Sequence, residues 1–269
     1  MSRTKRSYDL LMKLWPLGKI GNLLADTPLL SPLLRRCYSG EENEAIIIPV
    51  QETVRGTESL VLPLPLLEPL IARASARTIL HECLCRRGEG CRAFPHDIGC
   101  LFLGEGAARI EAALGRPAAL DEALDHVQAA MAAGLVPLVV HAAFDAWMLG
   151  IPYKRMLAIC FCCDCCCSVR QGLRLGPSAF WETVVRLPGL EVIVNDDCAG
   201  CGTCVQVCPA GAVQVVGGRA QITEACKGCG RCVAACPGRA ITLQLAERVD
   251  VVAQLLARVE ARTDIRSIS

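Results

Sequence analysis

The most constraining feature of this chain is a spacing of cysteines that occurs twice, close together. Each copy reads Cys, two residues, Cys, two residues, Cys, three residues, Cys and then Pro, and the copies span 198–209 and 226–237. Gaps of two residues allow three thiolates to converge on three corners of one metal–sulfur cube. The Pro after the fourth Cys turns the chain away from that cube. We therefore expect each fourth thiolate to reach the neighbouring cube.

Other metal sites explain this spacing less well. A zinc ribbon needs four thiolates and gives no reason for the Cys-Pro pair. A thioredoxin-like pair would be a single C-x-x-C, and attached haem would need a His directly after one. The glycines at 200, 202, 228 and 230 fit two clusters, because they permit a tight backbone with amide groups near the sulfurs.

The repeated run resembles the bacterial ferredoxins that carry two [4Fe–4S] clusters, in which the fourth Cys ligates the other cluster. The resemblance implies a ligand set for each cluster. Cluster one takes Cys198, Cys201, Cys204 and Cys236, and cluster two takes Cys226, Cys229, Cys232 and Cys208. It also implies a protein that transfers single electrons at a low reduction potential.

Ten further cysteines lie upstream in two groups, and Cys37 stands alone. The first group is Cys83, Cys85, Cys91 and Cys100, and the second is Cys160, Cys162, Cys163, Cys165, Cys166 and Cys167. Adjacent side chains diverge, so the six thiolates of the second group cannot all bind one cube. Free Cys is also a small core residue, which explains one or two of the six but not the run. All ten are therefore candidate metal ligands.

The upstream cysteines allow two arrangements. Either the first group holds one cluster alone and the later run holds another, or the two groups mix and one cluster joins both segments. Zinc is the rival metal, because four thiolates suit it equally well. We favour one or two additional iron–sulfur clusters, since the repeat already provides a route for electrons.

Charge and hydropathy narrow the class of protein. The chain has 28 basic and 27 acidic residues and no basic block, so a nucleic-acid partner is not expected. Its N-terminus does not read as a secretory signal, which favours reduced cysteines and a cytoplasmic location. No apolar run reaches transmembrane length. The stripe Leu10, Leu11 and Leu14 is expected to pack on the core, with docking of a partner or peripheral membrane contact as the alternatives.

Local patterns predict an α+β protein. We expect a mixed α/β cysteine-rich domain over 1–187, a two-cluster ferredoxin-like domain over 188–245, and a C-terminal helix and tail over 246–269. The predicted strands cover 44–50, 135–140, 191–195 and 241–245, with a hairpin of 213–216 and 220–223 that turns at Gly217-Gly218. The predicted helices cover 65–77, 120–134, 178–187 and 247–262, with short helices within 8–36.

Four histidines were considered as additional ligands. His81 and His96 flank cysteine loops, but the expected role of each is a surface or hydrogen-bonded residue. His126 is expected on the exposed face of its helix, and His141 in the core.

From His81 onward the chain resembles a family of cluster-binding, ferredoxin-like proteins from anaerobic bacteria and archaea. The stretches that carry the resemblance are CLCR at 83–86, LFLGEGA at 101–107, GLVP at 134–137 and CFCCDCCC at 160–167, with IIIPV at 46–50 upstream. Pro137 and Phe161 depart from the family, which has His and Asn at these places. The resemblance implies an oxygen-sensitive iron–sulfur protein that works with a redox partner or a larger oxidoreductase complex.

Two functions follow, and catalytic residues are assigned for neither. The first is an electron-transfer protein whose N-terminal domain carries extra clusters. The second is a reductase in which the ferredoxin domain feeds electrons to a site built from residues 160–167. The surplus of cysteines over ligand demand motivates the reductase. A redox sensor or assembly factor ranks below both, because the sequence offers no DNA-reading motif.

Overall fold

A computed structural model describes residues 2–17, 43–48, 64–163, 165–175, 183–208, 210–246 and 249–266. Cys37 and Ser178, the predicted N-cap of the helix over 178–187, lie outside the described residues. Helices and strands are both present, which agrees with the α+β class. The boundaries of the three expected domains stay a prediction.

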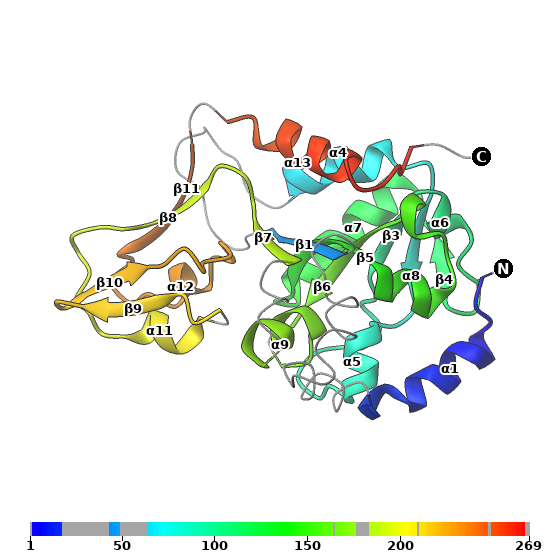
Figure 1. The fold of residues 1–269 in the computed structure, drawn as a ribbon, viewed down its shortest axis with the longest axis horizontal. Helices are drawn as coiled ribbons and strands as arrows, with labels where there is room; N and C mark the ends of the chain where they lie inside the picture. Colours follow the sequence, from blue (N-terminus) through cyan, green and yellow to red (C-terminus); the bar gives the residue numbers. More distant parts are fainter. Residues whose placement is uncertain are drawn as a thin grey trace, which may run out of the picture.

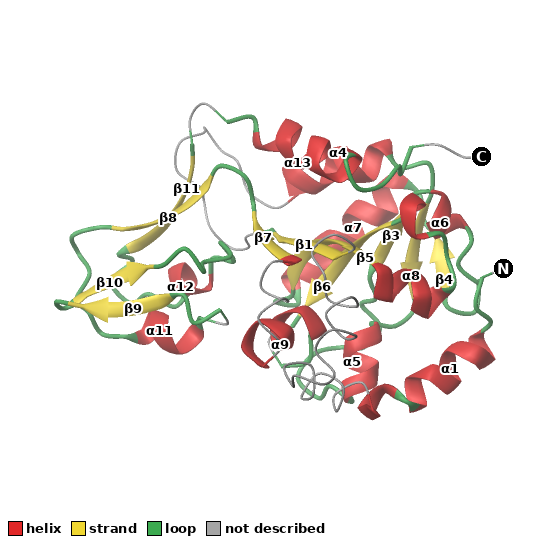
Figure 2. Ribbon diagram, viewed as in Figure 1, coloured by secondary structure: helices red, strands yellow, loops and turns green. Residues whose placement is uncertain are grey.

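A seven-stranded sheet forms the larger part of the structure (Figures 1 and 2). Its strands are β1 (Asn43–Ile47), β2 (Arg77–Leu80), β3 (Leu101–Leu103), β4 (Gly115–Pro117), β5 (Val136–Ala142), β6 (Leu157–Cys162) and β7 (Val184–Arg186). Their order is β4-β2-β3-β6-β5-β1-β7. The pairs are antiparallel except β1–β7, which is parallel. The strand predicted over 135–140 is confirmed as β5, and the one predicted over 44–50 is confirmed as β1 up to Ile47, with residues 49 and 50 outside the described residues.

Successive side chains of a strand point to opposite faces of a sheet. The large sheet therefore has one apolar layer on each face. In β6, Ile159 and Phe161 belong to one layer, whereas Ala158, Cys160 and Cys162 belong to the other. The same strand therefore presents bulky apolar side chains on one side of the sheet and two thiols on the other.

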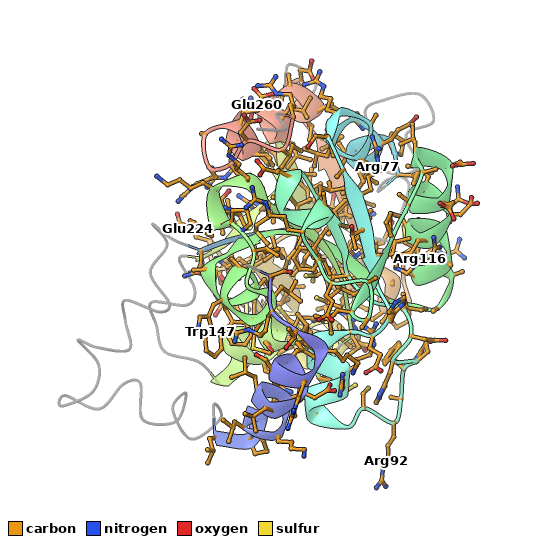
Figure 3. All side chains as sticks on the ribbon, turned by 90° about the vertical axis from the view of Figure 1, so that its right-hand side faces the viewer. Arg77, Arg92, Arg116, Trp147, Glu224 and Glu260 are labelled. Atoms are coloured by element: carbon orange, nitrogen blue, oxygen red, sulfur yellow. The ribbon has the colours of Figure 1, made fainter. Side chains whose placement is uncertain are left out.

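Helices cover both faces of the sheet. One layer includes side chains from α4 (Leu64–Arg73), α7 (Leu120–Ala132) and α13 (Val251–Glu260), and the other from α1 (Lys5–Lys13), α5 (Leu84–Glu89), α6 (Glu105–Ala108), α8 (Ala143–Leu149) and α9 (Ser168–Leu175). A 3-10 turn, η2 (Tyr153–Arg155), precedes β6. Glu260 of α13 and Arg92, which follows α5, lie at opposite ends of the view in Figure 3.

Three of the predicted helices are confirmed, with shifted ends. The helix predicted over 65–77 is α4, which ends at Arg73, and the chain enters β2 at Arg77. The helix over 120–134 is α7, and Gly134 at its stop has a φ of 78°. The helix over 247–262 contains α13.

The helix predicted up to Leu187 is wrong for its last turn. Val184–Arg186 instead form β7, which pairs with β1 along Ala45–Ile47. An available sheet edge outweighs a weak local preference for helix.

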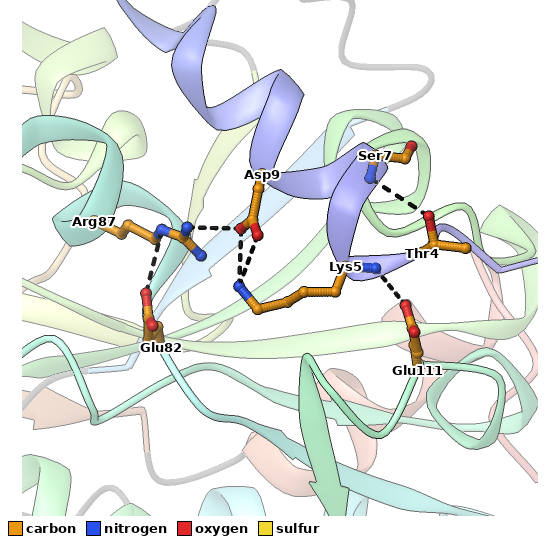
Figure 4. A network of polar contacts seen from close by, with 7 residues as sticks. All are labelled: Thr4, Lys5, Ser7, Asp9, Glu82, Arg87 and Glu111. Atoms are coloured by element: carbon orange, nitrogen blue, oxygen red, sulfur yellow. Dashed lines mark hydrogen bonds and ion pairs between the residues drawn. The ribbon is translucent and has the colours of Figure 1, made fainter.

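The predicted packing of the leucine stripe holds for Leu11, which is partly buried against one apolar layer, but is wrong for Leu10 and Leu14. Leu10 and Leu14 are 61% and 49% exposed, whereas Tyr8 and Met12 of the same helix are buried. Polar contacts fix this rotation of α1 (Figure 4). Asp9 pairs with Arg87 of α5 at 2.7 Å and with Lys5 at 2.8 Å. The ion pair with Arg87 holds the Asp9 side of α1 toward α5, whereas the Lys5 pair lies within α1.

The ferredoxin repeat, defined here as residues 190–245, lies at one end of the molecule (Figure 1). It contains β8 (Leu190–Val194), α11 (Thr203–Val207), β9 (Val213–Val216), β10 (Arg219–Ile222), α12 (Arg231–Ala234) and β11 (Ile241–Leu245). Strands β8 and β11 pair, as do β9 and β10, so the predicted strands and hairpin are confirmed. Gly217 and Gly218 make the hairpin turn with φ values of 58° and 79°.

The chain leaves the large sheet at β7, forms the repeat and returns through α13, which packs against α4. Among the described residues, no helix has the length and apolar character needed to cross a membrane.

Candidate iron–sulfur and metal sites

The two cysteine loops of the ferredoxin repeat have the same local structure. In each, a glycine in the left-handed region begins a short helix: Gly202 precedes α11 with a φ of 78°, and Gly230 precedes α12 with a φ of 77°. The third cysteine of each run, Cys204 or Cys232, lies in that helix and is buried. Glycine is suited to these positions because it adopts positive φ without steric cost.

The first loop borders a cavity of about 180 Å³. Cys198, Cys201 and Cys204 line it, and the fourth cysteine on its wall is Cys236, from the second loop. The set expected for cluster one therefore faces one space, although its members come from both copies of the motif.

The remaining four cysteines of the repeat also lie together. Cys208, from the first loop, interacts electrostatically with Cys226, Cys229 and Cys232. Burial, followed by the negative charges of the neighbouring thiolates, raises the pKa of Cys232 to about 12. Four crowded thiolates disfavour one another's charge unless a cation lies between them. A cationic metal–sulfur core would provide that positive charge.

Backbone amides donate hydrogen bonds to several of these sulfurs. The donor and acceptor pairs are Ala220 to Cys198 at 3.3 Å, Ala212 to Cys208 at 3.2 Å, Gly228 to Cys226 at 3.4 Å, and Ala240 to Cys236 at 3.3 Å. The bonds to Cys208 and Cys236 come from equivalent positions, four residues further along the chain. Such hydrogen bonds stabilise negative charge on sulfur and tune cluster potentials.

The upstream cysteines separate into two sites. The first site, the six-thiol pocket, contains Cys83, Cys85, Cys100, Cys160, Cys162 and Cys167. The Sγ atoms of Cys100 and Cys160 are 3.4 Å apart, and those of Cys162 and Cys167 are 2.8 Å apart. Cys83 contacts the thiols of Cys85 and Cys100. This pocket draws cysteines from both sequence groups.

Charged side chains that sequence reasoning left without a role surround the six-thiol pocket. Arg86 is fully buried and donates a 2.7 Å hydrogen bond to the Phe161 carbonyl. Hydrogen bonds from Cys100 and Cys85 lower the pKa of Cys83, and the charge of Arg86 adds to that shift. Burial, followed by the negative charge of Cys83, raises the pKa of Asp145 to about 7. The sequence signal for Arg86 was its place directly after Cys85. Asp145 carried no comparable signal.

The second site, the four-thiol site, contains Cys91, Cys163, Cys165 and Cys166, whose Sγ atoms all lie within 4.8 Å of one another. Cys165 is 3.6 Å from both Cys91 and Cys166. Burial raises the pKa of Cys91, but hydrogen bonds from Cys166 and from the amides of Ala93 and Phe94 outweigh it and bring the value down to about 7. The arrangement in which the two sequence groups mix therefore agrees with both upstream sites.

Two arginines connect the upstream sites with the ferredoxin repeat. Arg170 of α9 interacts electrostatically with Cys167 of the six-thiol pocket and with Cys229 of the repeat. Arg231 of α12 interacts with Cys163 of the four-thiol site. The second loop of the repeat thus faces the upstream cysteines.

The histidines contact backbone carbonyls. His81, His96 and His141 approach the carbonyls of Ala112, Cys91 and Tyr153 at 3.0, 2.6 and 2.9 Å. The expectation for His126 is wrong, because it is half-buried, lies 2.8 Å from the Gly99 carbonyl and packs edge-on against Phe161. His141 is in the core, as predicted.

Paired loops of this kind, in which the fourth cysteine of each loop lies with the three cysteines of the other, define a protein that holds iron–sulfur clusters. Residues 190–237 match the family model described as a 4Fe-4S dicluster domain. The match supports [4Fe–4S] binding by this part of the chain and an iron–sulfur electron-transfer function. No curated protein and no solved structure matches the chain.

Proposed function

We propose that this protein transfers electrons through two [4Fe–4S] clusters in the ferredoxin repeat and a third iron–sulfur centre in the six-thiol pocket. Cluster one takes Cys198, Cys201, Cys204 and Cys236, and cluster two takes Cys226, Cys229, Cys232 and Cys208. The cavity of about 180 Å³ that Cys236 shares with the first loop carries the proposal. The fourth ligand comes from the opposite loop, as two-cluster ferredoxins require.

The location of the six-thiol pocket supports the third centre. Its thiols come from the start of α5, the residue before β3, β6 and the residue before α9, and most are buried. Buried Arg86 would balance part of their negative charge, because a charge in the interior needs a partner. Arg170 lies between this pocket and Cys229 of cluster two. Electrons would pass between a cytoplasmic redox partner, the repeat and the pocket.

The domain organisation follows from this division of work. Residues 1–187 would form the cysteine-rich domain with the third centre, 188–245 the ferredoxin domain, and 246–269 the helix and tail that return to the first domain. Cys201, a ligand of cluster one, is exposed, which would make that cluster the entry point for a partner's electrons.

A reductase is the second candidate. The pocket holds six thiols, whereas a cube needs four, so two remain for a substrate or for a larger centre. In such an enzyme the repeat would deliver single electrons to a small molecule bound at the pocket. Turnover that disappears in Cys162→Ser, with intact ferredoxin signals, would distinguish a reductase from a carrier.

Iron and sulfide quantification with electron paramagnetic resonance, on protein purified without oxygen, tests the proposal. We expect about eight irons for the repeat and about four more for a pocket cluster. Cys204→Ser, Cys229→Ser and Cys162→Ser should each remove or alter one signal. Val205→Ala, on the exposed side of α11, is the matched control and should keep all three. Unchanged iron content in Cys204→Ser and Cys229→Ser would contradict the assignment.

A further inference from the structure

We propose that Cys91, Cys163, Cys165 and Cys166 bind a single Zn²⁺ ion in a tetrahedral site that carries no electrons. This site is separate from the clusters proposed above and does not depend on them. It replaces our sequence-based preference for iron–sulfur at these four cysteines.

The spacing of the sulfurs carries the argument. Four thiolates at about 2.3 Å from one zinc ion lie about 3.8 Å from one another in a tetrahedron. Here Cys165 Sγ lies 3.6 Å from the sulfurs of both Cys91 and Cys166, and all four Sγ atoms lie within 4.8 Å of one another. In a cube, each thiolate binds a different iron, so its ligands spread around a much larger core. The cavity at cluster one has that larger form.

A comparison within the molecule supports this reading. Among the described residues, the four-thiol site is the one group of four possible ligands as compact as this. The eight cysteines of the ferredoxin repeat do not meet the same limit in that part of the chain. This compactness separates the four-thiol site from the two ligand sets of the ferredoxin repeat, which are sized for a cube.

The site is closed, which is typical of structural rather than catalytic zinc. Its four ligands are protein thiols, and Cys91, Cys163 and Cys166 are buried. The Cys166 amide donates to the Cys163 sulfur at 3.3 Å. Such hydrogen bonds from the surroundings orient ligands and stabilise their charge.

The site joins three parts of the fold. Cys91 lies two residues after the end of α5, the other three follow β6, and Cys91 lies 74 positions before Cys165. A bound zinc ion with four thiolates has a net charge of −2. Arg231, from α12 of the ferredoxin repeat, interacts with Cys163 and supplies a positive charge beside it. Zinc would thereby hold the cysteine loops in the form that contacts the repeat.

Metal analysis of the full chain, made in medium containing both iron and zinc and purified without oxygen, tests the proposal. We expect about one zinc per chain. Cys91→Ser should lower the zinc content per chain at least fivefold, whereas the sulfide content and the cluster signals of the repeat should persist. Cys165→Ser changes an exposed ligand, so it tests the site with less disturbance of the core. Arg92→Ala is the matched control, because this neighbouring side chain points away from the body (Figure 3).

Replacing zinc with Co²⁺ gives a second readout. A tetrahedral four-thiolate site should produce strong visible cobalt bands in the wild type and in Arg92→Ala, and these should be lost in Cys165→Ser. Iron and sulfide lost together in both cysteine variants, with zinc absent from the wild type, would overturn the proposal. Zinc content and cobalt bands that stay unchanged in both cysteine variants would also overturn it. Loss of the ferredoxin signals in the wild type would instead count against the proposed electron-transfer function.

Discussion

The Arg258 guanidinium donates two hydrogen bonds of 2.7 Å to the two carboxylate oxygens of Glu44. Glu44 belongs to β1 and is 7% exposed, whereas Arg258 belongs to α13, on the far side of the ferredoxin repeat in sequence. Arg262 approaches the same carboxylate at 3.3 Å. This contact ties the returning helix to the large sheet and so holds both ends of the repeat.

Glu44→Gln should lower the free energy of unfolding by about 1–3 kcal/mol, because charge-assisted bonds to a buried carboxylate are lost. This loss of stability is smaller than for a fully buried ion pair, because both arginines are about a third exposed and solvent partly screens their charge. Denaturant unfolding and hydrogen exchange at 251–260 measure it. Arg73→Gln, which removes an exposed contact of 3.8 Å, should change stability by less than about 0.5 kcal/mol. Equal losses in both variants would contradict this account.

Gly200→Ala should abolish cluster one. A Cβ at this position would lie 2.2 Å from the carbonyl oxygen of Gly218, and the φ of 64° adds strain. Gly211→Ala is the matched control, because its φ is 60° but a Cβ there meets nothing within 4 Å. The control should keep its clusters at a cost of about 1–2 kcal/mol. Iron content and electron paramagnetic resonance distinguish the two variants, and full iron in Gly200→Ala would refute the steric argument.

Arg170→Met should lower the reduction potential of cluster two by roughly 50–100 mV. The positive charge of Arg170 lies near Cys229 and favours the more negative, reduced cluster, at an energy of about 1–2 kcal/mol through a partly screened interior. A potentiometric titration followed by electron paramagnetic resonance measures this shift. Arg116→Gln removes an arginine paired with exposed Glu122 and should leave the potential unchanged. Identical potentials in wild type and Arg170→Met would show that Arg170 does not act on this cluster.

His141 should make stability depend on pH. Burial lowers the pKa of His141, Arg262 lowers it further, and Glu44 and the Tyr153 carbonyl partly oppose the shift. Because the folded-state pKa is below the unfolded value of about 6.5, the unfolded chain binds more protons, and stability falls as the pH drops below that value. His141→Gln keeps a donor for the Tyr153 carbonyl and should lose less stability between pH 7.5 and 5.5. Denaturant unfolding measures this difference. Equal losses of stability in the wild type and His141→Gln would show that His141 is not the source of the pH dependence.

The ferredoxin repeat could be predicted closely, because cysteine spacing and turn glycines determine its local backbone. The division of the upstream cysteines could be predicted only in part. Period-two alternation in β6 places Cys160 and Cys162 on one side, but where Cys91 lies depends on how the loop after α5 folds over the sheet. Strand β7 and the rotation of α1 were mispredicted for a similar reason. Pairing with β1 and the contact of Asp9 with Arg87 are long-range interactions that local patterns do not encode.

The return of the chain through α13 has a consequence for biosynthesis. A ribosome releases α13 only after both cysteine loops have been made, so the surface of α4 that α13 covers stays open to water in the nascent chain. The packing of α13 on α4, which completes this apolar layer, can therefore occur only after all eight cysteines of the repeat have been synthesised.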